Sequence, residues 1–429
     1  MPVINGNPRS LDLPRFFIFS IFILLGIGRN LPGEILHFSG VGIVDLIVTS
    51  YSLISLLRCT SGTLQKDVIA YNRPYLHGLV FIFSWGFLSL VFNAFLYGFE
   101  LKDVFELFKY LYLLLLIHFV SSVTLHYGIN IALGFPFGVV LSSIVAIQNP
   151  MNPDVLGIPQ MFNPNVIGNC IGTSIFMCSM ISLRGNKAFS GIMAFSLLML
   201  SFFTYSKSAW IISLTAIAAF SLSFTSSFAK ISAVYKWVQL ILFSLLVVVV
   251  LTIVIQNYDL IYTIVNAKIQ ATQFASTAVE GGSAAARFGL MLSAFYMFLS
   301  NPLLGVGISN YEIVNQRLRS DLGSLFYPDD NANSAFFYIL GGMGLPAFAV
   351  FCYIFYVFSS RLARISGFVG LRANTFVFFG LLVFFLGGNV QVEMLTAYYF
   401  WVSIGLSTSL VIASDLDCSG SSATSISVS

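Results

Sequence analysis

The chain has 429 residues, of which 57% are hydrophobic and 9% are charged, and its mean hydropathy is +0.90. Soluble domains carry about 25% charged residues, so this composition excludes a water-soluble enzyme and a disordered chain. The net charge of +3 is small, and the distribution of the charges is therefore more informative than their sum.

Twelve apolar runs predict transmembrane helices, each of which needs about 20 mainly apolar residues. In chain order they are residues 16–28, 38–57, 75–98, 108–125, 128–147, 166–183, 188–205, 209–228, 237–256, 333–358, 374–389 and 394–413. We therefore expect an all-α, polytopic integral membrane protein with about 12 transmembrane helices and one large external loop.

The predicted helices divide the chain into four parts. These are residues 1–256 with helices one to nine, the large loop 257–332, residues 333–413 with helices ten to twelve, and a Ser-rich cytoplasmic tail, 414–429. Lysine and arginine concentrate on the cytoplasmic side of membrane proteins. With both chain ends in the cytoplasm, 12 of the 20 basic residues lie inside, and the large loop faces the periplasm or exterior.

A transporter is the alternative from another functional class, for example a flippase for lipid-linked oligosaccharides. Secondary transporters usually show two related halves and carry ionisable residues near the midplane of the membrane. This sequence shows no repeat, and its predicted helices are almost free of charge. The main exception is Asp45, which lies about 10 Å from the outer end of its predicted helix at 1.5 Å per residue. A membrane scaffold without catalytic activity is a third possibility, but it would leave the charges of the large loop without a cavity.

The loop 257–332 concentrates the polar and charged residues of the chain, and a loop of this length is typical of a functional segment. Residues 286–300 predict a short amphipathic helix at the membrane interface. Pro302 ends this helix, and Gly305 and Gly307 allow a tight turn after it.

Several short motifs occur in a characteristic order in and around this loop. They are Asn163-Pro164-Asn165, Thr204-Tyr205-Ser206-Lys207-Ser208, Arg287, Asn301-Pro302-Leu303-Leu304-Gly305-Val306-Gly307, Asn333-Ser334 and Gly341-Gly342-Met343-Gly344-Leu345-Pro346. Together they resemble the signature of the O-antigen polymerase and O-antigen ligase family, over roughly residues 150–350. Lys207 stands where the family usually has arginine.

The resemblance implies a metal-independent membrane glycosyltransferase of the C type that needs no cofactor. Such enzymes take a glycan from undecaprenyl pyrophosphate on the outer face of the bacterial inner membrane. A polymerase transfers it to the next lipid-linked repeat unit, and a ligase transfers it to the lipid A core. The expected partners are undecaprenyl-pyrophosphate-linked glycans, the lipid bilayer, a chain-length regulator and a flippase, but no nucleic acid.

A departing pyrophosphate needs fixed cations rather than a nucleophile, and guanidinium groups suit phosphate because they donate paired hydrogen bonds. The resemblance makes Arg287 the first candidate for this contact and Lys207 the second. For both, the alternative is a long side chain that reaches to the membrane interface. Arg317 and Arg319, two residues apart in the loop, are candidates for binding glycan or phosphate, or else belong to a solvated loop face. Asn333 completes the candidate substrate-binding set.

The general base is the remaining role. Ligases of this family carry a histidine directly before the asparagine that starts the tenth helix, and here that position is Ala332. Polymerases lack this histidine more often, so the sequence favours a polymerase, with a ligase as the alternative. Asp329 and Asp330 are the nearest carboxylates and the candidate catalytic residues. Their alternative roles are surface solvation or capping of the tenth helix.

Overall fold

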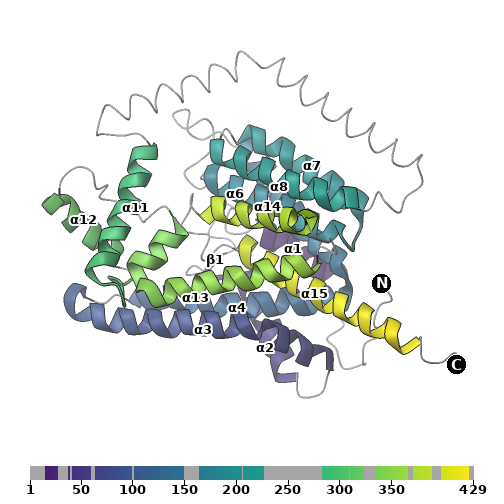
Figure 1. The fold of residues 1–429 in the computed structure, drawn as a ribbon, viewed down its shortest axis with the longest axis horizontal. Helices are drawn as coiled ribbons and strands as arrows, with labels where there is room; N and C mark the ends of the chain where they lie inside the picture. Colours follow the sequence, from purple (N-terminus) through teal and green to yellow (C-terminus); the bar gives the residue numbers. More distant parts are fainter. Residues whose placement is uncertain are drawn as a thin grey trace, which may run out of the picture.

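The structure is a computed structural model (Figure 1). It describes residues 15–27, 37–38, 41–58, 63–98, 101–148, 164–204, 206–226, 283–308, 310–322, 334–365, 371–388 and 398–424. The predicted ninth helix (237–256) and the candidates Asp329, Asp330 and Asn333 lie outside the described residues.

Helices make up nearly all of the described part of the chain (Figure 1). They are α1 (Arg15–Ile27), α2 (Ile43–Arg58), α3 (Thr63–Tyr97), α4 (Leu101–Tyr127), the 3-10 helix η3 (Ile129–Leu133), α5 (Gly134–Gln148), α6 (Pro164–Ser182), α7 (Lys187–Phe203), α8 (Lys207–Ser226), α11 (Ser283–Ser300), α12 (Tyr311–Leu322), α13 (Ala335–Ile365), α14 (Leu371–Gly388) and α15 (Tyr398–Thr424). One antiparallel pair of two-residue strands, β1 (His37–Phe38) and β2 (Val41–Gly42), precedes α2. The predicted all-α class is confirmed.

Four described helices are long and apolar enough to cross a membrane. These spans are Lys66–Tyr97, Leu107–Tyr127, Ala335–Ile365 and Tyr398–Leu416, and eight shorter apolar helices accompany them. Large apolar side chains such as Phe95, which is 87% exposed, cover the outside of α3, as expected of a surface that faces lipid. The chain is therefore a polytopic membrane protein. α15 continues to Thr424, past the predicted end of the last helix at residue 413.

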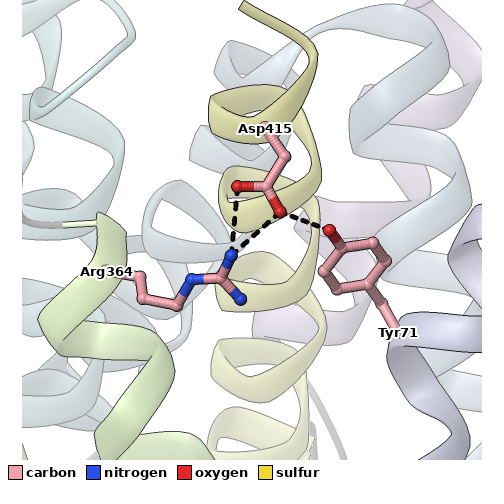
Figure 2. A network of polar contacts seen from close by, with 3 residues as sticks. All are labelled: Tyr71, Arg364 and Asp415. Carbon is pink, nitrogen blue, oxygen red and sulfur yellow. Dashed lines mark hydrogen bonds and ion pairs between the residues drawn. The ribbon is translucent and has the colours of Figure 1, made fainter. Parts of the chain in front are cut away.

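Two helices that are distant in sequence, α3 and α13, run antiparallel along each other. Ser89 of α3 lies beside Gly342, near the start of α13, and Tyr71 lies beside Arg361, near its end. At this second end, Asp415 of α15 accepts a hydrogen bond from the Tyr71 hydroxyl. The same carboxylate forms an ion pair with Arg364 at 3.1 Å, so three helices meet there (Figure 2).

Helices α6 and α8 run parallel and pack directly on each other, and α7 connects them in the chain. A Cβ at Gly168 would overlap Ala209, and one at Gly172 would overlap Ile212, so the first turns of both helices pack closely. The Asn169 side chain donates to the Gly387 carbonyl at 3.2 Å, which joins the end of α14 to the start of α6. These contacts bring the starts of α6 and α8 and the end of α14 to one end of the molecule.

The described residues contain a main hydrophobic core, which most helices share, and a smaller second core. The second core consists of Ala294, Met297, Val306, Tyr311 and Val314, with Tyr97, Leu318, Phe337 and Tyr338 packed against it. It joins α11 and α12 beside the start of α13, at one edge of the molecule (Figure 1). This edge carries the glycine turn that the sequence singled out.

Candidate functional site

Helix α13 is broken where the second glycine motif lies. Gly344 has φ of 77° and ψ of −175°, and Pro346 follows two residues later. In an unbroken helix, the N–H groups of residues 345 and 346 would bond to the carbonyls of Gly341 and Gly342. Pro346 has no N–H, and the Leu345 N–H donates instead to the Pro302 carbonyl at 2.8 Å. The carbonyls of Gly341 and Gly342 therefore need other donors.

The turn formed by residues 301–307, which we call the signature turn, supplies these donors. The Val306 N–H donates to the Gly341 carbonyl at 3.0 Å, and the Gly307 N–H donates to the Gly342 carbonyl at 2.9 Å. Gly305 has φ of 65°, and a Cβ there would come within 2.6 Å of both acceptor oxygens. Glycine is thus required at this position by backbone conformation and by space.

Three side chains of α3 hold the signature turn from its other side. Trp85 Nε1 donates to the Leu303 carbonyl at 3.2 Å and to the Met343 carbonyl at 3.1 Å. The Ser89 hydroxyl donates to the Leu304 carbonyl at 2.6 Å, and Asn93 Nδ2 donates to the Gly305 carbonyl at 3.2 Å. The three side chains are four residues apart, so they share one face of the helix. We call them the α3 ladder.

The residues of the α3 ladder are not among those that the sequence motifs predicted. Its only signal was the spacing of polar and tryptophan side chains at residues 85, 89 and 93 in an otherwise apolar span. The acceptors lie more than 200 residues away in sequence, so no local pattern identifies them.

The position of Arg287 follows from the packing of α11 on α13. A Cβ at Gly341 would come 2.8 Å from the Ala294 carbonyl oxygen, so these two residues lie side by side. Further along the chain in both cases, the Leu345 N–H donates a hydrogen bond to the Pro302 carbonyl. The two segments therefore run in the same direction. Arg287 precedes Ala294 by seven residues, or about 10 Å of helix. This offset places the Arg287 backbone level with Ser334, directly before α13.

Lys207 is the first residue of α8, in a turn that the neighbouring serines cap. The Ser206 hydroxyl accepts a hydrogen bond from the Ala209 N–H at 3.4 Å and pairs with the Ser208 hydroxyl at 2.8 Å. Trp210 Nε1 donates back to the Ser201 carbonyl at 3.0 Å. The Thr204–Ser208 motif is therefore a helix start, where backbone N–H groups and the helix dipole favour an anion.

A series of contacts joins these motifs at one end of the molecule. The Phe336 and Phe385 rings, 5.5 Å apart, link the start of α13 to the end of α14. The end of α14 bonds to Asn169 in α6, and α6 packs on the start of α8. The backbone positions of Arg287 and Lys207 and the start of α13 thus lie at the same end, although they are far apart in sequence.

Residues 192–352 match the family model described as O-antigen ligase. Over this range the chain is similar to the O-antigen polymerase and ligase family. The matched range begins in α7 and ends in α13, shortly after the break, and it includes Lys207, Arg287 and the signature turn. The expected extent of 150–350 agrees at its end but starts earlier than the match, so the Asn163-Pro164-Asn165 motif lies outside it. No curated protein matches the chain.

The family domain supports glycosyl transfer at the membrane as the general activity. The structure places two predicted candidates in a helix rather than in a loop. Arg317 and Arg319 lie on helix α12, so the expected loop at these residues is wrong. Residues two apart on a helix do not share a face. Arg317 is exposed, with its guanidinium 5.2 Å from the centre of the Tyr97 ring.

Asp45 has a structural explanation. α2 begins at Ile43, so Asp45 lies in the first turn of the helix rather than about 10 Å along it, and a carboxylate is favourable there. It is buried and accepts a hydrogen bond from the Tyr398 hydroxyl at the start of α15. This contact ties α2 to α15.

Proposed function

We propose that the protein is a polysaccharide repeat-unit polymerase of the O-antigen or capsule type. It transfers a growing glycan from undecaprenyl pyrophosphate to the next lipid-linked repeat unit, on the outer face of the inner membrane. The glycosyl-transfer domain supports the general activity. One observation carries the choice of polymerase: Ala332 stands where family ligases have a histidine, directly before Asn333.

The proposed reaction is a displacement at the anomeric carbon of the donor sugar. The acceptor hydroxyl forms the new glycosidic bond, the bond to the pyrophosphate oxygen breaks, and undecaprenyl pyrophosphate leaves with the electron pair. Arg287 and Lys207 stabilise the charge that develops on this leaving group. Asp329 or Asp330 accepts the proton of the attacking hydroxyl.

The arrangement of helices is consistent with an anionic leaving group. Lys207 stands at the start of α8, and the start of α6 lies beside it. The N-terminal ends of helices carry partial positive charge and free N–H donors. A pyrophosphate at this end of the molecule would meet these donors together with the side-chain cations.

A ligase is the second candidate, because the matching family model is described as O-antigen ligase. The two activities differ in what a cell without this protein makes. For a polymerase, single repeat units still reach the surface acceptor, while long chains disappear and single-repeat lipid accumulates. Polymer that is assembled on the lipid carrier but never attached would identify a ligase. Loss of both single units and polymer from the outer face would instead favour a flippase.

A further inference from the structure

The α3 ladder lies outside the matched family domain, yet it contacts the centre of the family's signature. Trp85, Ser89 and Asn93 donate to the carbonyls of three consecutive residues, 303, 304 and 305. Ser89 is 1% exposed and Asn93 is 2% exposed, so the side-chain donors of these two hydrogen bonds are shielded from water. The N–H groups of the turn are already used, since Gly305 donates to the Asn301 carbonyl and the next two residues donate to α13.

The ladder connects elements of the two hydrophobic cores, which Tyr338 of α13 joins by packing against both. α11, the signature turn and α12 contribute to the second core, whereas α3 and α13 belong to the main core. Trp85 joins the turn to α13, because its N–H reaches Leu303 of the turn and Met343 directly before the break. A buried carbonyl left without a donor is unfavourable, so the Ser89 and Asn93 bonds favour one placement of the turn.

We infer that Trp85, Ser89 and Asn93 are positioning residues for glycosyl transfer. They fix the signature turn against the main bundle, and this sets the place of Arg287, on α11, relative to the start of α13. The inference rests on the proposed function, in which Arg287 contacts the donor pyrophosphate and Asp329 or Asp330 accepts the proton of the acceptor hydroxyl. A misplacement of about 1 Å between reacting groups can lower a rate about 100-fold.

The first test is a kinetic comparison of Ser89→Ala and Asn93→Leu with matched controls. Ser52 and Asn72 are also buried, and they hydrogen-bond to Leu115 and Ser121, away from the turn, so Ser52→Ala and Asn72→Leu remove similar groups. Lipid-linked repeat units extracted from cells that lack the protein serve as donor and acceptor. We expect the ladder variants to lower kcat by roughly 10- to 100-fold with little change in KM. Ser89→Thr, which keeps the hydroxyl, should restore kcat.

The second test does not depend on activity. Spin labels are attached at Tyr296 in α11 and Leu88 in α3, both of which are exposed, in a protein whose native cysteines have been replaced. The labels report the distance between α11 and α3. We expect a broader distance distribution in Asn93→Leu than in the wild type, and an unchanged one in Asn72→Leu.

The outcomes separate this inference from the proposed function. Wild-type kcat in both ladder variants would overturn the positioning role, and so would a lower yield of protein whose kcat per folded molecule is normal. If the wild type itself transfers no glycan, the proposed function fails, and the spin-label distances alone then decide whether the ladder positions the turn.

Discussion

We expect Gly305→Ala to displace the signature turn from α13. Gly305 has φ of 65°, a conformation that costs other residues about 1–2 kcal/mol. A Cβ there would also lie 2.6 Å from the carbonyl oxygens of Gly341 and Gly342, which accept the N–H groups of the turn. Relief of this overlap breaks two hydrogen bonds of about 1 kcal/mol each. The docked turn therefore loses about 3–4 kcal/mol.

Gly98→Ala is the matched control for this substitution. Gly98 also has positive φ, 94°, at the end of α3, but a Cβ there would meet nothing within 4 Å. This variant should therefore lose only the backbone contribution of about 1–2 kcal/mol. The difference of about 2 kcal/mol corresponds to about 30-fold in the docking equilibrium of the turn.

The assay is transfer between extracted lipid-linked repeats, with rates normalised to the amount of folded protein. Thermal unfolding in detergent provides a second measurement. Gly305→Ala should lose at least about tenfold in rate, and Gly98→Ala should stay close to the wild type. Equal rates and equal unfolding midpoints for the two variants would refute the argument that the turn must dock on the break in α13.

Four further predictions concern the candidate site and the orientation of the chain. In a cysteine-free variant, a single cysteine at Ser283 should react with an impermeant thiol reagent from outside, and one at Ser425 should react only after permeabilisation. The reverse pattern would contradict the predicted orientation, because it would place the loop 257–332 in the cytoplasm. Arg287→Lys should lose much of the transfer activity and Arg287→Ala nearly all, at normal protein level, because lysine lacks the paired donors of a guanidinium. Lys207→Arg should keep activity and Lys207→Ala should lose it. If Lys207→Ala is active, Lys207 does not bind the pyrophosphate and only reaches to the membrane interface. Asp415→Asn should change the free energy of unfolding by about 0–1 kcal/mol, because its ion pair with Arg364 is exposed, with side-chain exposures of 58% and 38%.

The transmembrane helices were predictable because an apolar run long enough to cross a membrane has few alternatives to a helix. Helix α12 was missed for the opposite reason, since its residues are mostly polar. Its buried side chains are nevertheless at residues 311, 314 and 315, with Leu318 packed beside them. This spacing is typical of one face of a helix, so a search for periodicity rather than hydropathy would have found it.

The candidate site was predictable as a set of motifs but not as an arrangement. The sequence order placed the Asn301–Gly307 motif before the Gly341–Pro346 motif, and nothing in either one shows that they bond to each other. Their pairing depends on which backbone carbonyl groups the broken helix leaves without a hydrogen-bond donor. The contacts of Trp85, Ser89 and Asn93 could not be predicted for the same reason. Their acceptors are backbone carbonyls, which every residue has, so no residue type in the sequence marks them.

The hydrogen bonds also explain why two glycine motifs, almost 40 residues apart, belong to one signature. A continuous α13 would pair the Leu345 N–H with the Gly341 carbonyl and leave the Val306 N–H without an acceptor, and Pro346 would still give the Gly342 carbonyl no donor from within the helix. A broken α13 without the turn would leave both carbonyls without donors. Either element alone leaves backbone groups unpaired, and the break and the turn together pair them. The break and the turn therefore form a single structural unit. One arm of this unit leads back through α11 to Arg287, and the other is the first part of α13, which begins at Ala335, two residues after Asn333 in the sequence. The unit therefore sets the spacing between Arg287 and the start of α13, which follows the residues proposed to act on the acceptor.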